Sequence, residues 1–129
     1  MPLTITAIYG SFLALFLLVL AVPVIKLRRG LGVGLGDGGH QSLQQAIRAH
    51  GNAAEFIPIF VILLAIFELN HAPALTLHIY GAIFLAARLA HAWGLYRHSG
   101  VSAGRFLGVL GTNGCIIGLA IGNIIKVLA

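Results

Sequence analysis

Charge is scarce in this chain, and acidic charge is almost missing. All charged residues together make up 9% of the 129 residues, and the three acidic ones are Asp37, Glu55 and Glu68. Soluble domains carry about 25% charged residues, so the composition excludes an ordinary soluble protein. With 59% hydrophobic residues and a mean hydropathy of +0.99, the chain is predicted to be an integral membrane protein of one domain.

Cysteine occurs once, and this excludes an internal disulfide and a thiolate metal site. Cys115 lies in an apolar stretch, where a small packed side chain is the simplest interpretation. No basic residue precedes the first apolar stretch, so we expect a retained span and not a cleaved signal peptide. The net charge of +5 comes from residues at the ends of apolar stretches. Membrane orientation explains such residues, and no nucleic-acid partner is expected.

Motifs for nucleotide or metal chemistry are also missing. The sequence GLGDGG at 34–39 matches a glycine-rich phosphate loop by its letters, but no strand precedes it and no Lys-Ser/Thr follows. Six histidines are present, none with the H-E-x-x-H spacing of a metal site. We expect no metal. Haem held by two histidines from different helices is the alternative that remains open.

Long apolar segments predict four membrane-spanning helices. Residues 3–25 carry no charge and are long enough to cross a hydrocarbon core of about 30 Å. Pro73 suits the first turn of a helix. The predicted fold is an all-α membrane bundle forming a single domain, with spans at about residues 3–27, 41–69, 73–96 and 104–127.

The distribution of Lys and Arg predicts the orientation. Basic residues follow the first span and flank the connection between the third and fourth spans, whereas the connection between the second and third has none. By the positive-inside rule, the first and third connections face the cytoplasm and both termini lie outside it. Lys126 opposes this assignment weakly.

The fourth span is rich in glycine. Gly114, Gly118 and Gly122 form two overlapping small-xxx-small pairs. Glycine lets helix backbones approach closely, which is how helices associate in lipid. The pattern predicts a helix–helix interface, within the subunit or between subunits.

A polar stripe begins the second span. Arg48, Asn52 and Glu55 are spaced i, i+4 and i+7, so they share one face of the helix. Arg88 and His91 are three residues apart on the third span and share a face there. Charges inside a membrane are costly unless they pair or meet water, and they usually mark a functional site.

These residues predict an anionic ligand. A structural Arg–Glu bridge between helices is the alternative, but arginines outnumber the acidic groups here. The guanidinium group of arginine can form two parallel hydrogen bonds to a carboxylate. Glutamate accepts hydrogen bonds from an ammonium group, and asparagine both donates and accepts hydrogen bonds. Glutathione, with two carboxylates, an amine and amide groups, matches this set. An arginine beside its thiol would favour the nucleophilic thiolate.

The same residues resemble a known family. RAHGNAAEFIP (48–58) resembles the second-helix signature of the MAPEG family, the membrane-associated proteins in eicosanoid and glutathione metabolism. ARLAHAWG (87–94) resembles the third-helix signature, and VIKLRRG with GDGG resembles the first loop. The length, the four spans and the short loops are similar to the bacterial branch, so the resemblance covers nearly the whole chain.

The resemblance implies a homotrimer that binds glutathione between subunits near the cytoplasmic face. It implies that Arg105 is the catalytic residue that stabilises the thiolate, although a different loop length shifts the register there. Arg28, Asp37 and Tyr96 are further candidates at the site. The residues that the resemblance implies for glutathione binding are Lys26, Arg48, Asn52, Glu55, Arg88 and His91.

Two positions depart from the family pattern. Phe56 and Leu95 stand where tyrosines occur in relatives, so two hydroxyl contacts are missing and weaker glutathione binding is expected. The function predicted is a glutathione transferase or peroxidase of the bacterial inner membrane that acts on a lipophilic small molecule entering from the lipid. The alternatives are a non-catalytic lipid-binding protein of the same fold and a proton-coupled exporter that uses Glu55.

Overall fold

Four helices make up the fold. The computed structural model describes residues 2–128 and contains no strand within that range. Each helix is long and apolar enough to cross a membrane, and the predicted all-α four-helix bundle is confirmed. The helices are α1 (Thr4–Leu31), α2 (Gln41–Leu69), α3 (Ala74–Arg97) and α4 (Ala103–Leu128).

The first helix runs past residue 27, where the sequence suggested its end. Arg28 and Arg29 form its last turn, where basic side chains interact favourably with the helix dipole. The helix stops at Gly32, which adopts a left-handed conformation with φ 68°. Glycine takes this conformation without strain, so this residue ends α1.

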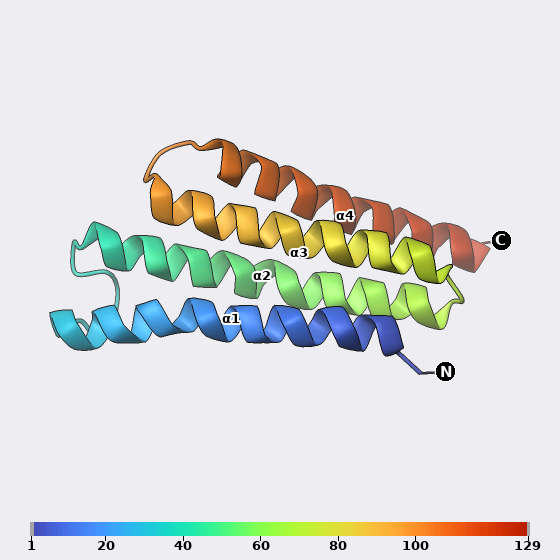
Figure 1. The fold of residues 1–129 in the computed structure, drawn as a ribbon, viewed down its shortest axis with the longest axis horizontal. Coiled ribbons are helices and arrows are strands. Elements are labelled where there is room, and N and C mark those ends of the chain that lie inside the picture. The colour runs from blue at the N-terminus through green and yellow to red at the C-terminus, as the bar shows by residue number, and fades with distance from the viewer. Residues whose placement is uncertain (1, 129) are drawn as a thin grey trace.

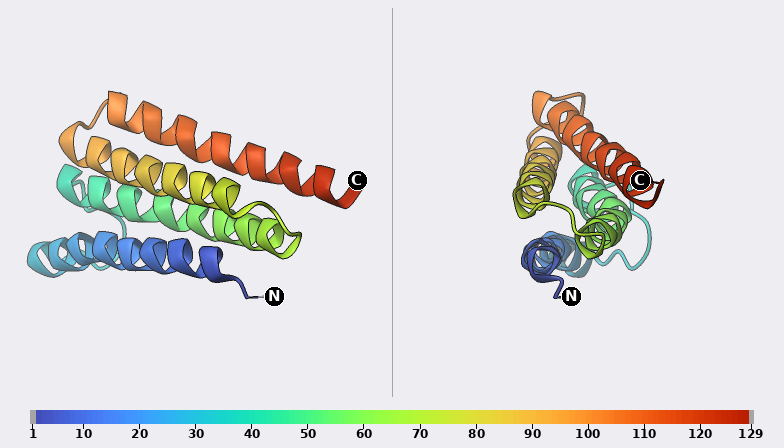
Figure 2. Two further views of the ribbon diagram at one scale, coloured as in Figure 1. Left: turned by 45° about the vertical axis from the view of Figure 1, so that its right-hand side comes forward. Right: turned by 90° about the vertical axis from the view of Figure 1, so that its right-hand side faces the viewer.

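Neighbours in the sequence are neighbours in space (Figure 1). The middle helices α2 and α3 pack on each other, α1 lies against α2 and α3, and α4 lies against α3 and α2. Within the described chain, α1 and α4 do not contact each other. Both termini lie at one end of the bundle, and the α1–α2 and α3–α4 loops lie at the other (Figures 1 and 2). We call the latter the loop end.

Aromatic and aliphatic side chains fill the centre of the bundle. Phe60 of α2 and Phe84 of α3 are fully buried and stack with their ring centroids 3.8 Å apart. Leu13, from α1, and Leu119, from α4, are also fully buried. All four helices thus share one core, which fixes how far apart their loop ends lie.

Most glycines of α4 face the other helices of the same chain. A Cβ on Gly108 would lie 2.5 Å from the His91 Cβ and 2.7 Å from the Ala87 carbonyl oxygen. Gly122 approaches the Phe67 ring of α2 in the same way, whereas nothing lies within 4 Å of a Cβ on Gly114. Most of the glycine face therefore packs within the subunit, which resolves the choice that the sequence left open.

Glu68 links the end of α2 to the start of α1. It lies in the last turn of α2. Its carboxylate accepts hydrogen bonds from the backbone N–H groups of Ile5 (2.9 Å) and Thr6 (2.7 Å). These are orphan donors of the first turn of α1, and a negative charge is favourable beside them.

Candidate functional site

A cavity opens at the loop end, between α2, α3 and the start of α4. Its volume is about 530 Å³, within the usual range for a small-molecule site. Two loops form its mouth, since Asp37 and Gly39 come from the α1–α2 loop and Ser99 from the α3–α4 loop. The remaining lining residues are Gln41, Gln44, Gln45, Arg48, Asn52, His91, Leu95 and Arg105.

The polar stripe of α2 forms one wall. Arg48 and Asn52 line the cavity, and three glutamines extend the stripe toward the start of the helix. Gln45 donates from Nε2 to the Leu95 carbonyl oxygen of α3 at 3.1 Å. This leaves its carbonyl oxygen as an acceptor, so the wall offers donors at Arg48 and an acceptor at Gln45.

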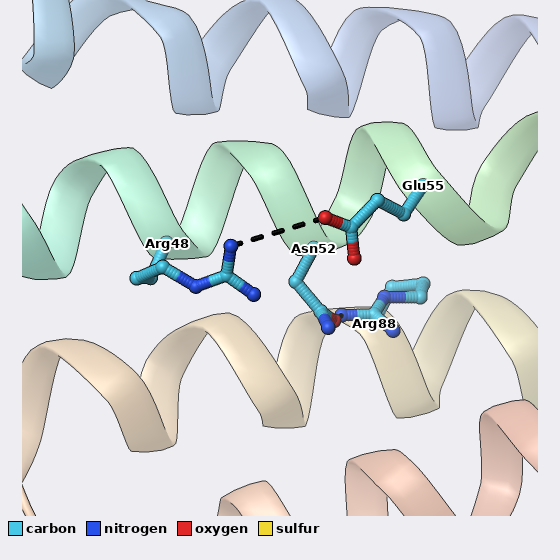
Figure 3. Close-up of polar contacts among 4 residues, drawn as sticks. All are labelled: Arg48, Asn52, Glu55 and Arg88. Carbon is cyan, nitrogen blue, oxygen red and sulfur yellow. Dashed lines mark hydrogen bonds and ion pairs between the residues drawn. The ribbon is translucent and has the colours of Figure 1, made fainter.

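Glu55 stands on the same stripe but outside the cavity lining. Its Oε1 lies 3.8 Å from the Arg48 Nη1, and the two side chains are 58% and 56% exposed (Figure 3). This long ion pair is formed within α2. Over residues 2–128 it is the one Lys/Arg–carboxylate pair present, so the bridge between helices that the sequence allowed does not form.

Arg88 lies behind the cavity wall and not on its surface. It is 1% exposed and donates from Nη2 to the Asn52 Oδ1 at 2.6 Å and from Nη1 to the Thr112 Oγ1 at 3.1 Å. Figure 3 shows its guanidinium group directly beside the Asn52 amide. The resemblance implied that Arg88 contacts the ligand; the structure places it one side chain further back.

His91 reaches the cavity from α3. It is 4% exposed and lines the cavity together with Leu95, one turn further along. Its Nδ1 is buried and has no hydrogen-bond partner within the part of the chain that the structure describes. A buried polar atom of this kind normally has a partner, so Nδ1 is an unsatisfied group next to the cavity.

Arg105 enters from the first turn of α4. Its side chain lines the cavity, and its Nη1 donates to the carbonyl oxygens of Gly100 (2.7 Å) and Ser99 (3.4 Å). Ser102 caps the helix, since its hydroxyl accepts from the Arg105 backbone N–H at 3.3 Å. Cap and loop together hold the guanidinium group at the cavity mouth.

The loop after α1 brings Asp37 to the same mouth. Arg28 donates to the carbonyl oxygens of Val33 (3.3 Å) and Gly36 (2.9 Å), and Asp37 accepts from the Gly39 N–H at 2.9 Å. Arg28 is therefore engaged in shaping the loop. Neither it nor the exposed Lys26 and Tyr96 line the cavity.

The cavity carries more positive than negative charge. Arg48 and Arg105 face one acidic residue, Asp37, whose Oδ1 already accepts a backbone hydrogen bond. Arg88 adds a third cation directly behind the wall. Cations in a confined space raise the local potential and attract anions, and the lining presents both donors and acceptors. The arrangement suits a small anionic ligand that offers hydrogen-bond donors as well as acceptors.

Sequence reasoning missed several lining residues. Gln45 lies three residues before Arg48, and Gln41 lies four residues before Gln45. The polar stripe therefore continues for about two more turns toward the start of the helix. Extending the periodicity toward the start of α2 would have found them. Ser99, which lines the cavity, and Thr112, which bonds Arg88 behind it, carried no such signal, because their roles depend on packing between helices.

Known proteins resemble this chain over most of its length. The pattern of the MAPEG family matches residues 6–125. The inner membrane protein YecN of Escherichia coli (strain K12) is 42% identical over 105 residues, which cover 77% of this chain and 80% of that protein. YecN of Escherichia coli O6:H1 (strain CFT073) matches equally well. Every residue that lines the cavity lies within the matched range 6–125.

Proposed function

The chain belongs to the MAPEG family, and from this premise we propose that it is a membrane glutathione transferase or peroxidase. The cavity at the loop end would bind glutathione. A lipophilic molecule from the bilayer would be the second substrate. One observation carries the proposal: His91, Arg48, Asn52 and Arg105, from three helices, line a single cavity of about 530 Å³ with an excess of positive charge.

The chemistry of glutathione fits this lining. One of its carboxylates can pair with the guanidinium group of Arg48, which can donate two parallel hydrogen bonds. Its amine can donate to Asp37 or to the side-chain oxygen of Gln45, both of which line the cavity. Leu95 offers an apolar surface in place of a hydroxyl, which is consistent with modest affinity.

Arg105 is the proposed catalytic residue. A guanidinium group near the thiol favours the thiolate, which is the reactive form. In a transferase reaction the sulfur forms a bond to an electrophilic carbon and the leaving group departs with its electron pair. In a peroxidase reaction the sulfur attacks one peroxide oxygen, an alcohol leaves, and a second glutathione reduces the sulfenic acid to a disulfide and water.

The proposal includes a homotrimer. Glu55 lies half way along α2 and Arg48 lies about two turns nearer its start, and both side chains are more than half exposed. Charged groups in contact with lipid chains are costly, so a neighbouring subunit that covers this face would remove the cost. Such a neighbour would also close the open side of the cavity and bring Glu55 to a bound ligand.

Location follows from the same relatives. The two E. coli proteins are named as inner membrane proteins, and α1 to α4 supply the spans. We place this chain in a bacterial inner membrane with the loop end in the cytoplasm and both termini outside. Lys26, Arg28 and Arg29 at the loop end favour this orientation.

A conjugation assay tests the proposed activity. Purified protein in detergent or nanodiscs is mixed with glutathione and 1-chloro-2,4-dinitrobenzene, or with a fatty-acid hydroperoxide in a second assay. We expect turnover that saturates with glutathione and requires intact protein. Absence of both activities in a folded sample that also fails to bind glutathione would leave the non-catalytic lipid-binding protein of the same fold as the better account.

A further inference from the structure

Arg88 is a buried cation whose contacts are all with neutral groups. Its Nη2 donates to the Asn52 Oδ1 and its Nη1 to the Thr112 Oγ1. The Phe56 ring lies 5.8 Å from the centre of the guanidinium group, and Nε is buried without a partner within residues 2–128. A side chain that is 1% exposed and this fully enclosed has little freedom to reorient.

This geometry decides which way the Asn52 amide points. A guanidinium group has only donors, so the atom of Asn52 that faces Arg88 must be the carbonyl oxygen. The other half of the amide, the NH₂ group, is then the part left for the cavity that Asn52 lines. The positive charge beside the carbonyl also polarises the amide and strengthens its N–H groups as donors.

Thr112 holds Arg88 from the opposite side. Its hydroxyl belongs to α4, is 1% exposed and lies 3.1 Å from the Arg88 Nη1. One chain of contacts therefore links α4 through α3 to the amide on α2. Neither Thr112 nor Arg88 lines the cavity.

We infer that Thr112 and Arg88 are positioning residues that lock the Asn52 amide with its N–H groups toward the cavity. The ligand must therefore present a hydrogen-bond acceptor, a carboxylate or a carbonyl oxygen, at Asn52. A ligand with a donor there is rejected, because a buried N–H facing another donor stays unpaired. The inference deepens the proposed function and takes from it only the identity of the probe, glutathione.

Calorimetric titration with glutathione tests the role of Thr112. Thr112→Val removes the hydroxyl at nearly constant volume, and we expect the Kd to rise about tenfold, the effect of one hydrogen bond to a charged group. Thr112→Ser keeps the hydroxyl and should bind within about twofold of the wild type. Thr6→Val, the same change at a buried threonine of the other end, serves as the matched control and should leave the Kd unchanged. An unchanged Kd in Thr112→Val would overturn the inference.

Asn52→Asp separates positioning from a merely structural link. The new carboxylate would pair with Arg88, so the thermal stability should be retained or raised. It would present no N–H and would repel an anion, so the Kd should rise by about 100-fold or more. A variant that is as stable as the wild type and binds glutathione equally well would contradict the assigned amide orientation.

A readout without ligand keeps the inference independent of the proposed function. Nitrogen-15 NMR of the side chains should show slowly exchanging Arg88 guanidinium protons and a single Asn52 amide environment in the wild type and in Thr112→Ser. Both signatures should be lost in Thr112→Val. If glutathione does not bind the folded wild type but these signatures behave as expected, the proposed function fails. The positioning of the Asn52 amide by Thr112 and Arg88 still stands. NMR signatures that are unchanged in Thr112→Val would overturn the positioning role of Thr112.

Discussion

Two arginines, Arg88 and Arg105, illustrate what decides function at the scale of single residues. Both were candidates from the sequence, but Arg88 is enclosed behind Asn52 whereas Arg105 lines the cavity mouth. Periodicity correctly placed Arg88 and His91 on the same α3 face. It could not show that Thr112, 24 residues further along the chain, would occupy one side of the guanidinium group, because that contact depends on how α3 and α4 pack.

Arg105→Leu tests the assignment of the catalytic residue. We expect turnover to fall about 100-fold or more, because a charge that stabilises the thiolate is lost, while glutathione still binds. Steady-state conjugation rates and calorimetric titration measure the two effects separately. The control is Arg97→Leu, since Arg97 lies over the Trp93 ring at 4.9 Å and does not line the cavity. Turnover that survives in Arg105→Leu would remove Arg105 from its role.

At the scale of helices, the sequence predicted the elements well and their junctions less well. Long apolar runs and punctuating Gly and Pro residues identify spans, because a bilayer requires a minimum length. The end of α1 was missed, since Arg28 and Arg29 are compatible with a helical last turn and only Gly32 stops it. The role of Glu68 was also hidden, because its partners are backbone groups some 60 residues earlier in the chain.

Gly108→Ala tests the close packing of α4 on α3. The added methyl group would clash with His91 and the Ala87 carbonyl, and such overpacking costs about 1–3 kcal/mol. We expect a lower midpoint in thermal unfolding. Gly114→Ala is the matched control, since its Cβ would meet open space and alanine is the better helix former. Equal stability of the two variants would argue against this interface.

Glu68→Gln tests the link between the ends of α1 and α2. The substitution keeps the size of the side chain but removes the charge that faces the first N–H groups of α1. Charge-assisted hydrogen bonds and the helix dipole predict a loss of about 1–2 kcal/mol in the free energy of unfolding. Asp37→Asn, at an exposed loop carboxylate that accepts one backbone N–H, should cost less, and thermal unfolding of both variants measures the difference.

The whole molecule has one face that the single chain leaves incomplete. The described chain buries the Phe60 and Phe84 rings and packs most glycines of α4 against its other helices, but it leaves Glu55 and Arg48 exposed on α2. The four apolar helices pack around one core, although α1 and α4 of the described chain do not contact each other. They do not by themselves shield a charge in the middle of a membrane, and the proposed trimer would cover it.

Native mass spectrometry from detergent micelles tests the assembly. We expect a species of three times 13.6 kDa that persists at low micromolar protein. Glu55→Ala should weaken this trimer if the subunit interface satisfies the carboxylate, since a partner group would then lose its pair. A wild-type protein that is monomeric in several mild detergents would refute the trimer and leave the cavity to be explained within one chain.

The central claim, that the cavity binds glutathione, is tested most directly by calorimetric titration of glutathione into the purified wild type, Arg48→Ala and Arg97→Ala. Arg48 lines the cavity and Arg97 does not. The account predicts saturable binding to the wild type, the same binding to Arg97→Ala, and none to Arg48→Ala. Failure of the folded wild type to bind, or equal binding by all three proteins, would contradict it.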